Sequence, residues 1–160
     1  MFNINIICVG KLKEKYLKEA IDEYSKRLSK YCDLKIIEIQ DEKIPDRTNE
    51  SIIEEIKNKE AEKIISNIKK EAYIICLDLK GKEMTSIEFS ENIENIKVNG
   101  YNNITFIIGG SLGIANKVLK IAKEKICFSK MTFPHQLFRV FLLEQIYRGF
   151  KIASNEKYHL

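Results

Sequence analysis

The sequence is poor in the residues that build metal centres. Its 160 residues include two histidines and four cysteines. No two cysteines stand in a C-x-x-C pair, the spacing most typical of zinc ligands, so we expect no metal site. Cys8, Cys32, Cys76 and Cys127 are predicted to be reduced thiols that pack as small apolar side chains in a reducing cytosol.

Long apolar runs and targeting segments are also missing. No apolar stretch reaches the roughly 20 residues needed to span a bilayer. The first ten residues lack a basic lead and predict a strand rather than a secretory signal peptide. No repeat, low-complexity tract or linker divides the chain. With 44% hydrophobic and 31% charged residues, we expect one cytoplasmic domain over residues 1–160 that buries its own core.

Glycine is scarce, yet three of the seven glycines gather in Gly109-Gly110-Ser111-Leu112-Gly113. This turn has neither the G-x-G-x-x-G spacing of dinucleotide-binding folds nor the Lys-Ser/Thr pair of a P-loop. Its bare backbone would let a ligand approach closely. The simpler alternative is a tight strand-to-helix turn that requires positive φ.

Strand-like apolar runs alternate with helical patterns along the whole chain, which is typical of a parallel sheet covered by helices on both faces. Such sheets bind ligands beyond the carboxyl ends of their strands, so the loops after Leu77, Ile108 and Phe128 are candidate site loops. A capping box from Thr85 or Ser86 to Glu88 opens one of the helices. We predict strands at 4–9, 34–39, 73–77, 104–108 and 126–128, and helices ending near 31, over 50–70, over 85–96, over 114–123 and from 134 onward.

The last predicted helix is more apolar than a surface helix needs to be. Pro134 is placed in its first turn, with Thr132 as a candidate capping residue. The apolar positions that follow cover more than one stripe of about 100°. One face can meet the domain's own core, and we expect the remainder to form a subunit interface.

Basic residues gather at the two ends of the chain. Residues 1–31 carry seven Lys or Arg against four acids, and residues 130–160 carry five against two. His135 and Arg139 are four apart near the positive end of the last helix, a placement that suits an anion or a nucleic acid. They could equally be ordinary residues at the edge of a packed helix.

Three segments together resemble one protein family. They are GKLKEKY at 10–16, IIGGSLG at 107–113 and FSKMTFPHQLFRVFLLEQIYRGFKI at 128–152, followed by a terminal EKYHL. The resemblance is to the bacterial 23S rRNA pseudouridine-N3-methyltransferases of the SPOUT class, the RlmH family, and it runs the whole length. Two positions depart from the pattern: Leu112 stands where a polar residue is expected, and Leu160 where a basic one is common.

The resemblance implies an α/β parallel-sheet sandwich with a C-terminal trefoil knot within roughly residues 100–160. It also implies that S-adenosylmethionine binds in the knot of a homodimer. Leu77 would then pack on the cofactor, while Gly109 and Gly110 would approach it with their backbone. The loop before the last helix would wrap the cofactor mainly through main-chain groups of Phe128, Ser129, Lys130, Met131, Thr132 and Phe133.

The same resemblance implies methylation of N3 of a pseudouridine in 23S rRNA, on the large subunit or the whole ribosome, without a metal. His135, Arg139, Tyr158 and His159 are the candidate catalytic residues. Arg139 is expected to hold RNA phosphate or the uracil oxygens. Tyr158 or His159, reaching across from the partner subunit, would orient the base or relay its proton, unless the tail only closes the site.

A basic surface for RNA is predicted from six side chains that the sequence places near these segments: Lys11, Lys13, Lys15, Lys130, Arg148 and Lys151. Two other functions remain open from the residues alone. One is another nucleotide-binding α/β enzyme, such as a reductase or phosphotransferase. The other is a non-enzymatic RNA- or ribosome-binding module. The loop at 40–49 is predicted to be exposed, and either mobile or able to close over a site.

Overall fold

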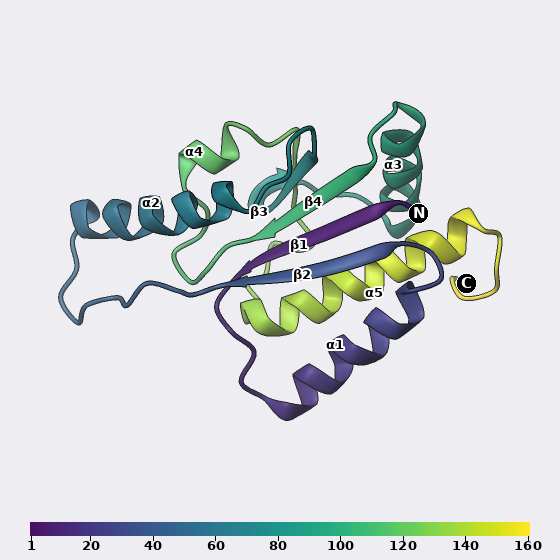
Figure 1. The fold of residues 1–160 in the computed structure, drawn as a ribbon. Coiled ribbons are helices and arrows are strands. Elements are labelled where there is room, and N and C mark those ends of the chain that lie inside the picture. Colours follow the sequence, from purple (N-terminus) through teal and green to yellow (C-terminus); the bar gives the residue numbers. More distant parts are fainter.

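A parallel β-sheet runs through the middle of the protein and helices cover both of its faces (Figure 1). The computed structural model describes all of residues 1–160. Its elements are β1 (Asn3–Val9), α1 (Lys15–Leu28), β2 (Asp33–Ile39), α2 (Glu50–Ser66), β3 (Tyr73–Lys82), α3 (Ser86–Val98), β4 (Asn103–Ile108), α4 (Asn116–Leu119), β5 (Glu124–Ile126) and α5 (His135–Ala153). The five strands lie in the order β2-β1-β4-β3-β5 and every neighbouring pair is parallel. The predicted α/β sandwich is confirmed.

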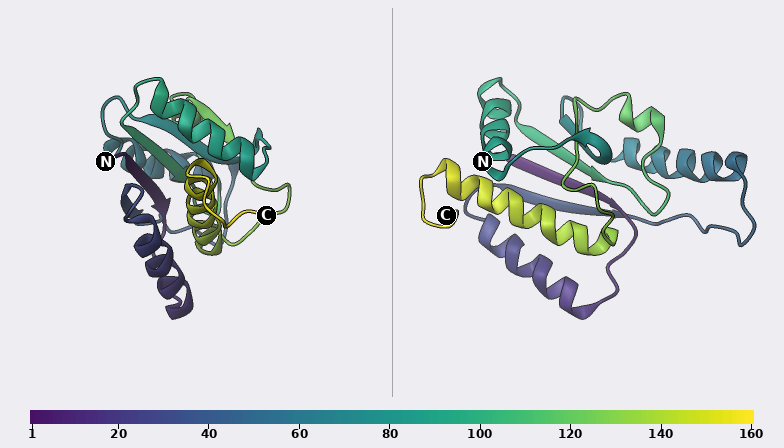
Figure 2. Two further views of the ribbon diagram at one scale, coloured as in Figure 1. Left: turned by 90° about the vertical axis from the view of Figure 1, so that its right-hand side faces the viewer. Right: turned by 180° about the vertical axis from the view of Figure 1, so that it is seen from behind.

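The two faces of the sheet follow from the two-residue period of its strands. In β1, Ile4, Ile6 and Cys8 point to the core formed with α1, α3 and α5. The intervening Ile7 and Val9 belong to the second core, formed with α2 and α4. Both faces are covered, which explains why the inner strands read as continuous apolar runs. Viewed from behind, α5 and α1 lie side by side on one face (Figure 2).

Helix α3 begins as its sequence predicts and packs closely on α5. The Thr85 side chain accepts the Glu88 N–H, and the Glu88 carboxylate accepts the Thr85 N–H, so the capping box is complete. Further along, Ser90 Oγ donates to the Gly149 carbonyl at 2.6 Å. A Cβ at Gly149 would lie 3.6 Å from the backbone of Ser90. These two small residues let the helices approach, and they fix α5 against α3.

Strands β3 and β5 differ from their predicted limits. β3 does not end near Leu77 but continues to Lys82. Both Leu77 and Lys82 pair with Ile126, so residues 78–81 form a bulge between two contacts with one residue of β5. A Cβ at Gly81 would lie 2.6 Å from the Ile126 nitrogen, so only glycine fits there. β5 ends at Ile126 rather than Phe128, because its neighbour Cys127 donates its N–H to Lys82 and the chain then turns.

Four helices also differ from their predicted limits: α4 after the glycine-rich turn, the start of α5, and the ends of α1 and α2. α4 has four residues instead of the range 114–123, because Lys123 already donates its N–H to Ile74 and leads the chain into β5. Pro134 is the N-cap of α5 and not a residue of its first turn. Thr132 does not cap the helix, since no side-chain hydrogen bond is made at this end. α1 and α2 end three to four residues earlier than expected.

The four cysteines are buried and free, as the sequence predicts. Burial raises the pKa of the Cys8, Cys32 and Cys76 thiols to about 12, so they remain protonated at neutral pH. No cluster of three or more His, Cys, Asp or Glu side chains is arranged to hold a metal ion. None of the helices combines the length and the apolar character that crossing a bilayer requires. The trefoil knot stays a prediction, because strand order and pairing do not establish threading.

Candidate functional site

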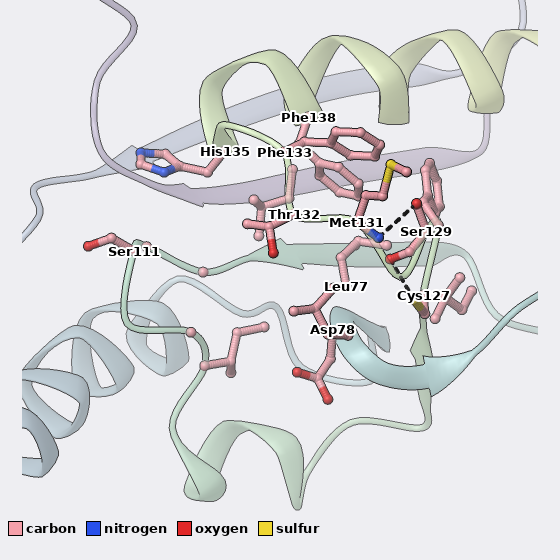
Figure 3. A pocket seen from close by; sticks show the side chains of 18 of the residues that line it. Leu77, Asp78, Ser111, Cys127, Ser129, Met131, Thr132, Phe133, His135 and Phe138 are labelled. Atoms are coloured by element: carbon pink, nitrogen blue, oxygen red, sulfur yellow. Dashed lines mark hydrogen bonds between the residues drawn. The ribbon is translucent and has the colours of Figure 1, made fainter. Parts of the chain in front are cut away.

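A pocket of about 340 Å³ opens where β4 and β5 end, beside the bulge of β3. Figure 3 shows Leu77 and Asp78 from β3, Ser111 from the glycine-rich turn and Met131, Thr132 and Phe133 from the loop before α5 gathered around it. The three candidate loops therefore converge, as a parallel sheet predicts. The lining, here called the strand-end pocket, consists of Leu77, Asp78, Leu79, Ile108, Gly109, Gly110, Ser111, Leu112, Gly113, Ile114, Ile126, Cys127, Phe128, Ser129, Met131, Thr132, Phe133, His135 and Phe138.

The glycine-rich turn brings bare backbone to the pocket for two reasons. Gly113 has φ +85° and donates its N–H to the Gly110 carbonyl at 3.0 Å, which closes a tight turn. Gly109 lacks positive φ but has no room for a side chain, because a Cβ would lie 2.7 Å from Ile114 Cγ1. The turn thus satisfies both expectations made for it: it needs glycine for its own shape, and it exposes backbone to the pocket.

The loop at 127–133 forms the opposite wall and is held by its own polar groups. Ser129 Oγ accepts the Met131 N–H at 3.0 Å, and the Cys127 thiol donates to the Ser129 carbonyl. Beneath it, the Phe128 ring packs against Phe138 with centroids 5.1 Å apart. Aromatic packing therefore supplies a firm apolar floor.

Of the nine residues predicted to bind a cofactor, eight line the strand-end pocket. Lys130 does not: its side chain is exposed and points to Glu83, 3.9 Å away. His135 lines the pocket as well. Asp78 was not singled out from the sequence, although its place directly after an apolar strand run could have identified it. It supplies the only carboxylate in the lining.

The charge of the lining limits the ligands it suits. The strand-end pocket contains Asp78 but neither lysine nor arginine. A nucleoside triphosphate or dinucleotide site normally surrounds its phosphates with cationic side chains or a helix N-terminus. The helix that directly follows the glycine-rich turn, α4, has four residues. The pocket is better suited to a neutral or cationic ligand with a flat apolar part.

Arg139 lies apart from the surface that the sequence assigns to it. Its side chain is 1% exposed, and its Nη1 donates to Glu38 Oε2 at 2.8 Å. Its Nη2 donates to the Gly10 carbonyl at 3.3 Å, while its Nε has no partner. Burial alone would raise the pKa of Glu38, but hydrogen bonds from Arg139 and the Leu12 N–H outweigh it and lower that pKa. The guanidinium therefore fastens the β1–α1 loop to α5, and the predicted direct contact with RNA lacks the exposure it needs.

Tyr158 and His159 lie along the other end of α5 and line none of the strand-end pocket. The Tyr158 hydroxyl donates to Glu144 Oε2 at 2.9 Å. Arg148 joins the same carboxylate through its Nε and Nη2, and its Nη1 lies 3.1 Å from His159 Nδ1. Within one chain, the sequence-predicted catalytic residues thus lie in three places: His135 at the pocket, Arg139 buried against Glu38 and Gly10, and Tyr158 and His159 beside Arg148.

Comparisons with known proteins agree on one family. The sequence profile of the family described as Predicted SPOUT methyltransferase matches residues 2–159. Ribosomal RNA large subunit methyltransferase H 1 of Clostridium perfringens (strain SM101 / Type A) is 62% identical over 157 residues, covering 98% of this chain and 99% of the relative. Ribosomal RNA large subunit methyltransferase H of Clostridium tetani is 60% identical over the same shares. The protein of that name from Clostridium botulinum (strain Eklund 17B / Type B) is 61% identical.

Proposed function

Because the chain belongs to the SPOUT methyltransferase family, we propose that it transfers a methyl group from S-adenosylmethionine to N3 of a pseudouridine in large-subunit ribosomal RNA. The observation that carries the cofactor assignment is the lining of the strand-end pocket, which holds an acidic side chain and neither lysine nor arginine. The RNA assignment rests on the names of the relatives. The assembled ribosome, in the cytoplasm, is the expected substrate.

The pocket fits this cofactor in size and in chemistry. A volume of about 340 Å³ lies in the range of small-molecule sites. Gly109 and Gly110 offer backbone groups, Phe138 and Phe128 offer a flat apolar surface, and Asp78 offers a carboxylate. The carboxylate suits ribose hydroxyls or a cationic group. When bound, the sulfonium supplies an electrophilic methyl group without any metal.

The chain's residues would then have to place N3 in line with that methyl group and accept the N3 proton. In the transfer, the bond from sulfur to the methyl carbon breaks as the bond from N3 to that carbon forms, and the N3 proton passes to a base. His135 is the imidazole in the pocket lining and is our candidate for this base or for orienting the uracil. Arg139 would act indirectly, by holding the β1–α1 loop beside His135.

The proposed enzyme is a homodimer. The rim of the strand-end pocket leaves Leu79 58% and Met131 73% exposed, and Phe141 nearby on α5 is 37% exposed. Apolar side chains gathered at a rim favour a protein partner. A second copy of the chain would cover them and bring its Tyr158 and His159 toward the first copy's pocket, where the chain's own tail does not reach.

A cofactor titration with matched glycine variants tests the proposal. Gly109→Ala should weaken S-adenosylmethionine binding at least about tenfold, because its Cβ would displace Ile114 and reshape the turn. Gly100→Ala is the control, since Gly100 has φ +94° and no atom within 4 Å of an added Cβ. It should reduce stability by about 1–2 kcal/mol and leave cofactor binding unchanged.

Methyl transfer to large subunits, whole ribosomes and free 23S rRNA, followed by mapping of the modified base, identifies the substrate. We expect one modified pseudouridine. A protein that binds these RNAs but neither binds S-adenosylmethionine nor transfers its methyl group would be a binding module, and the proposal would be wrong.

A further inference from the structure

Five lysines from two separate stretches of sequence, 80–82 and 119–125, surround a second hollow, of about 480 Å³, at the free edge of the sheet. Lys80 and Lys82 come from the end of β3, Lys120 and Lys123 from the turn after α4, and Lys125 from β5. All five are exposed. We call this group the lysine basin.

The charge of the lysine basin is not neutralised within the protein. None of the five ammonium groups forms an ion pair. The single carboxylate in its lining belongs to Glu124, which already accepts hydrogen bonds from the Tyr73 hydroxyl and the Asn92 amide. Five like charges around one hollow repel one another and create a strongly positive local potential.

The cations selected from the sequence differ in this respect. Arg148 pairs with Glu144 at 3.1 Å, Lys151 with Glu156 at 2.8 Å, and Lys130 lies 3.9 Å from Glu83. Lys15 also lies 3.9 Å from Glu19, so four of the six cations of that predicted RNA surface are already paired with the chain's own acids. The lysine basin was not detectable from sequence, because its members lie 45 residues apart in a central region whose net charge is negative.

The lysine basin adjoins the strand-end pocket through shared strands. Lys80 follows Leu79, and Lys125 precedes Ile126, and both of these neighbours line the pocket. The Cys127 N–H donates to the Lys82 carbonyl at 3.0 Å, which ties the basin to the pocket wall. The basin and the pocket therefore lie on adjoining segments of β3 and β5, a few residues apart along each strand.

We propose that the lysine basin binds the phosphate backbone of the RNA substrate beside the nucleotide that is methylated. This inference rests on the proposed function for its substrate. Lysine is suited to the task, since it contacts phosphates as a point charge without reading sequence. Specificity for the base would come from the pocket and from the shape of the RNA.

The test is the triple variant Lys80→Gln, Lys82→Gln, Lys125→Gln, compared with the triple variant Lys26→Gln, Lys35→Gln, Lys43→Gln. The control lysines are also exposed and unpaired, and they lie on α1, β2 and the loop after β2. Both variants lose three positive charges. We would measure binding to unmethylated large ribosomal subunits and to free 23S rRNA over a range of salt, and KM and kcat for methyl transfer.

The basin variant should raise KM for the subunit about tenfold or more, with kcat at saturation and S-adenosylmethionine binding unchanged. Its plot of log affinity against log salt should be shallower by about 2, as expected for three lost phosphate contacts. Equal KM values and equal salt slopes for the two triple variants would overturn the inference. If the wild type transferred no methyl group, the proposed function would fail, and the RNA-binding slopes would still decide on the basin.

Discussion

The two ends of α5 hold their arginines in opposite ways. Arg139, near the start, is 1% exposed and is held by Glu38 and the Gly10 carbonyl. Arg148, more than two turns later, lies over the Tyr158 ring with its carbon Cζ 4.7 Å from the ring centroid and shares Glu144 with the Tyr158 hydroxyl. The first arginine is part of the core and the second belongs to a surface network that includes the tail.

This difference separates two tasks within one helix. A buried ion pair that loses one partner leaves an uncompensated charge, so the start of α5 is costly to change. A surface network adds little stability and can rearrange. We infer that the first end fixes the pocket and that the second end is the part free to engage another subunit.

The largest effect is expected at Glu38. Glu38→Ala leaves the buried Arg139 guanidinium without its carboxylate and should lower the free energy of unfolding by about 3 kcal/mol in urea denaturation. Arg139→Met should cost less, because Glu38 is 35% exposed and can be hydrated once the arginine is gone. If Arg139→Met proves the more damaging of the two, the hydrogen bond from the guanidinium to the Gly10 carbonyl matters more than the charge left unpaired in Glu38→Ala.

His159→Ala should separate catalysis from stability at the other end. The His159 imidazole is exposed, and its one hydrogen-bond contact is with Arg148. We expect kcat for methyl transfer to fall about tenfold or more, with the unfolding midpoint unchanged. An undiminished rate at saturating ribosome would remove His159 from the mechanism and leave the tail as a cover.

Arg148→Met should change the free energy of unfolding by about 0.5–1 kcal/mol, the range for a partly exposed ion pair. Matched denaturation curves for this variant and for Arg139→Met provide the direct comparison of the two ends. A loss at Arg148 as large as that at Arg139 would show that the tail network is structural.

The smallest effect should appear only in alkali. Burial, followed by the hydrogen bond to Glu144, raises the pKa of Tyr158 to about 12. The neutral phenol is favoured in the folded state, so its stabilisation is complete below pH 10 and is lost as pH rises toward 12. In Tyr158→Phe, the decline of stability between pH 10 and 12 should therefore be shallower than in the wild type. Tyr16→Phe, at an exposed position, should leave the decline unchanged.

Local patterns predicted the parts of the fold that local chemistry controls. Thr85 and Glu88 form the capping box that their spacing indicates, and the alternation of strands and helices is correct. The predicted end of β5 at Phe128 was wrong, because Cys127 and Phe128 are apolar for a reason other than membership of a strand. Phe128 packs against Phe89 of α3 and Phe138 of α5, and Cys127 is buried beside it, so burial here comes from distant segments rather than from a strand.

The parts of the site that depend on strand order and backbone turns were predictable from the sequence. The parts that depend on contacts between distant side chains were not. Leu77, Gly109 and Met131 meet in one pocket because parallel strands end at a common edge. Nothing in the sequence near Arg139 indicates that it would be buried and would pair with a carboxylate 101 residues away. The exposure of a charged residue depends on which distant elements pack beside it, so the sequence placed Arg139 on a surface that it does not occupy and did not single out the basin lysines.

The bulge of β3 connects the strand-end pocket to the lysine basin. Residues 78–81 leave and return to one backbone position, Ile126, and they carry both a wall of the pocket and the first lysine of the basin. A displacement of residues 78–81 would therefore move both the wall of the strand-end pocket and Lys80 of the lysine basin. Any effect of occupancy in one on affinity at the other must, by thermodynamic reciprocity, have the same factor in both directions.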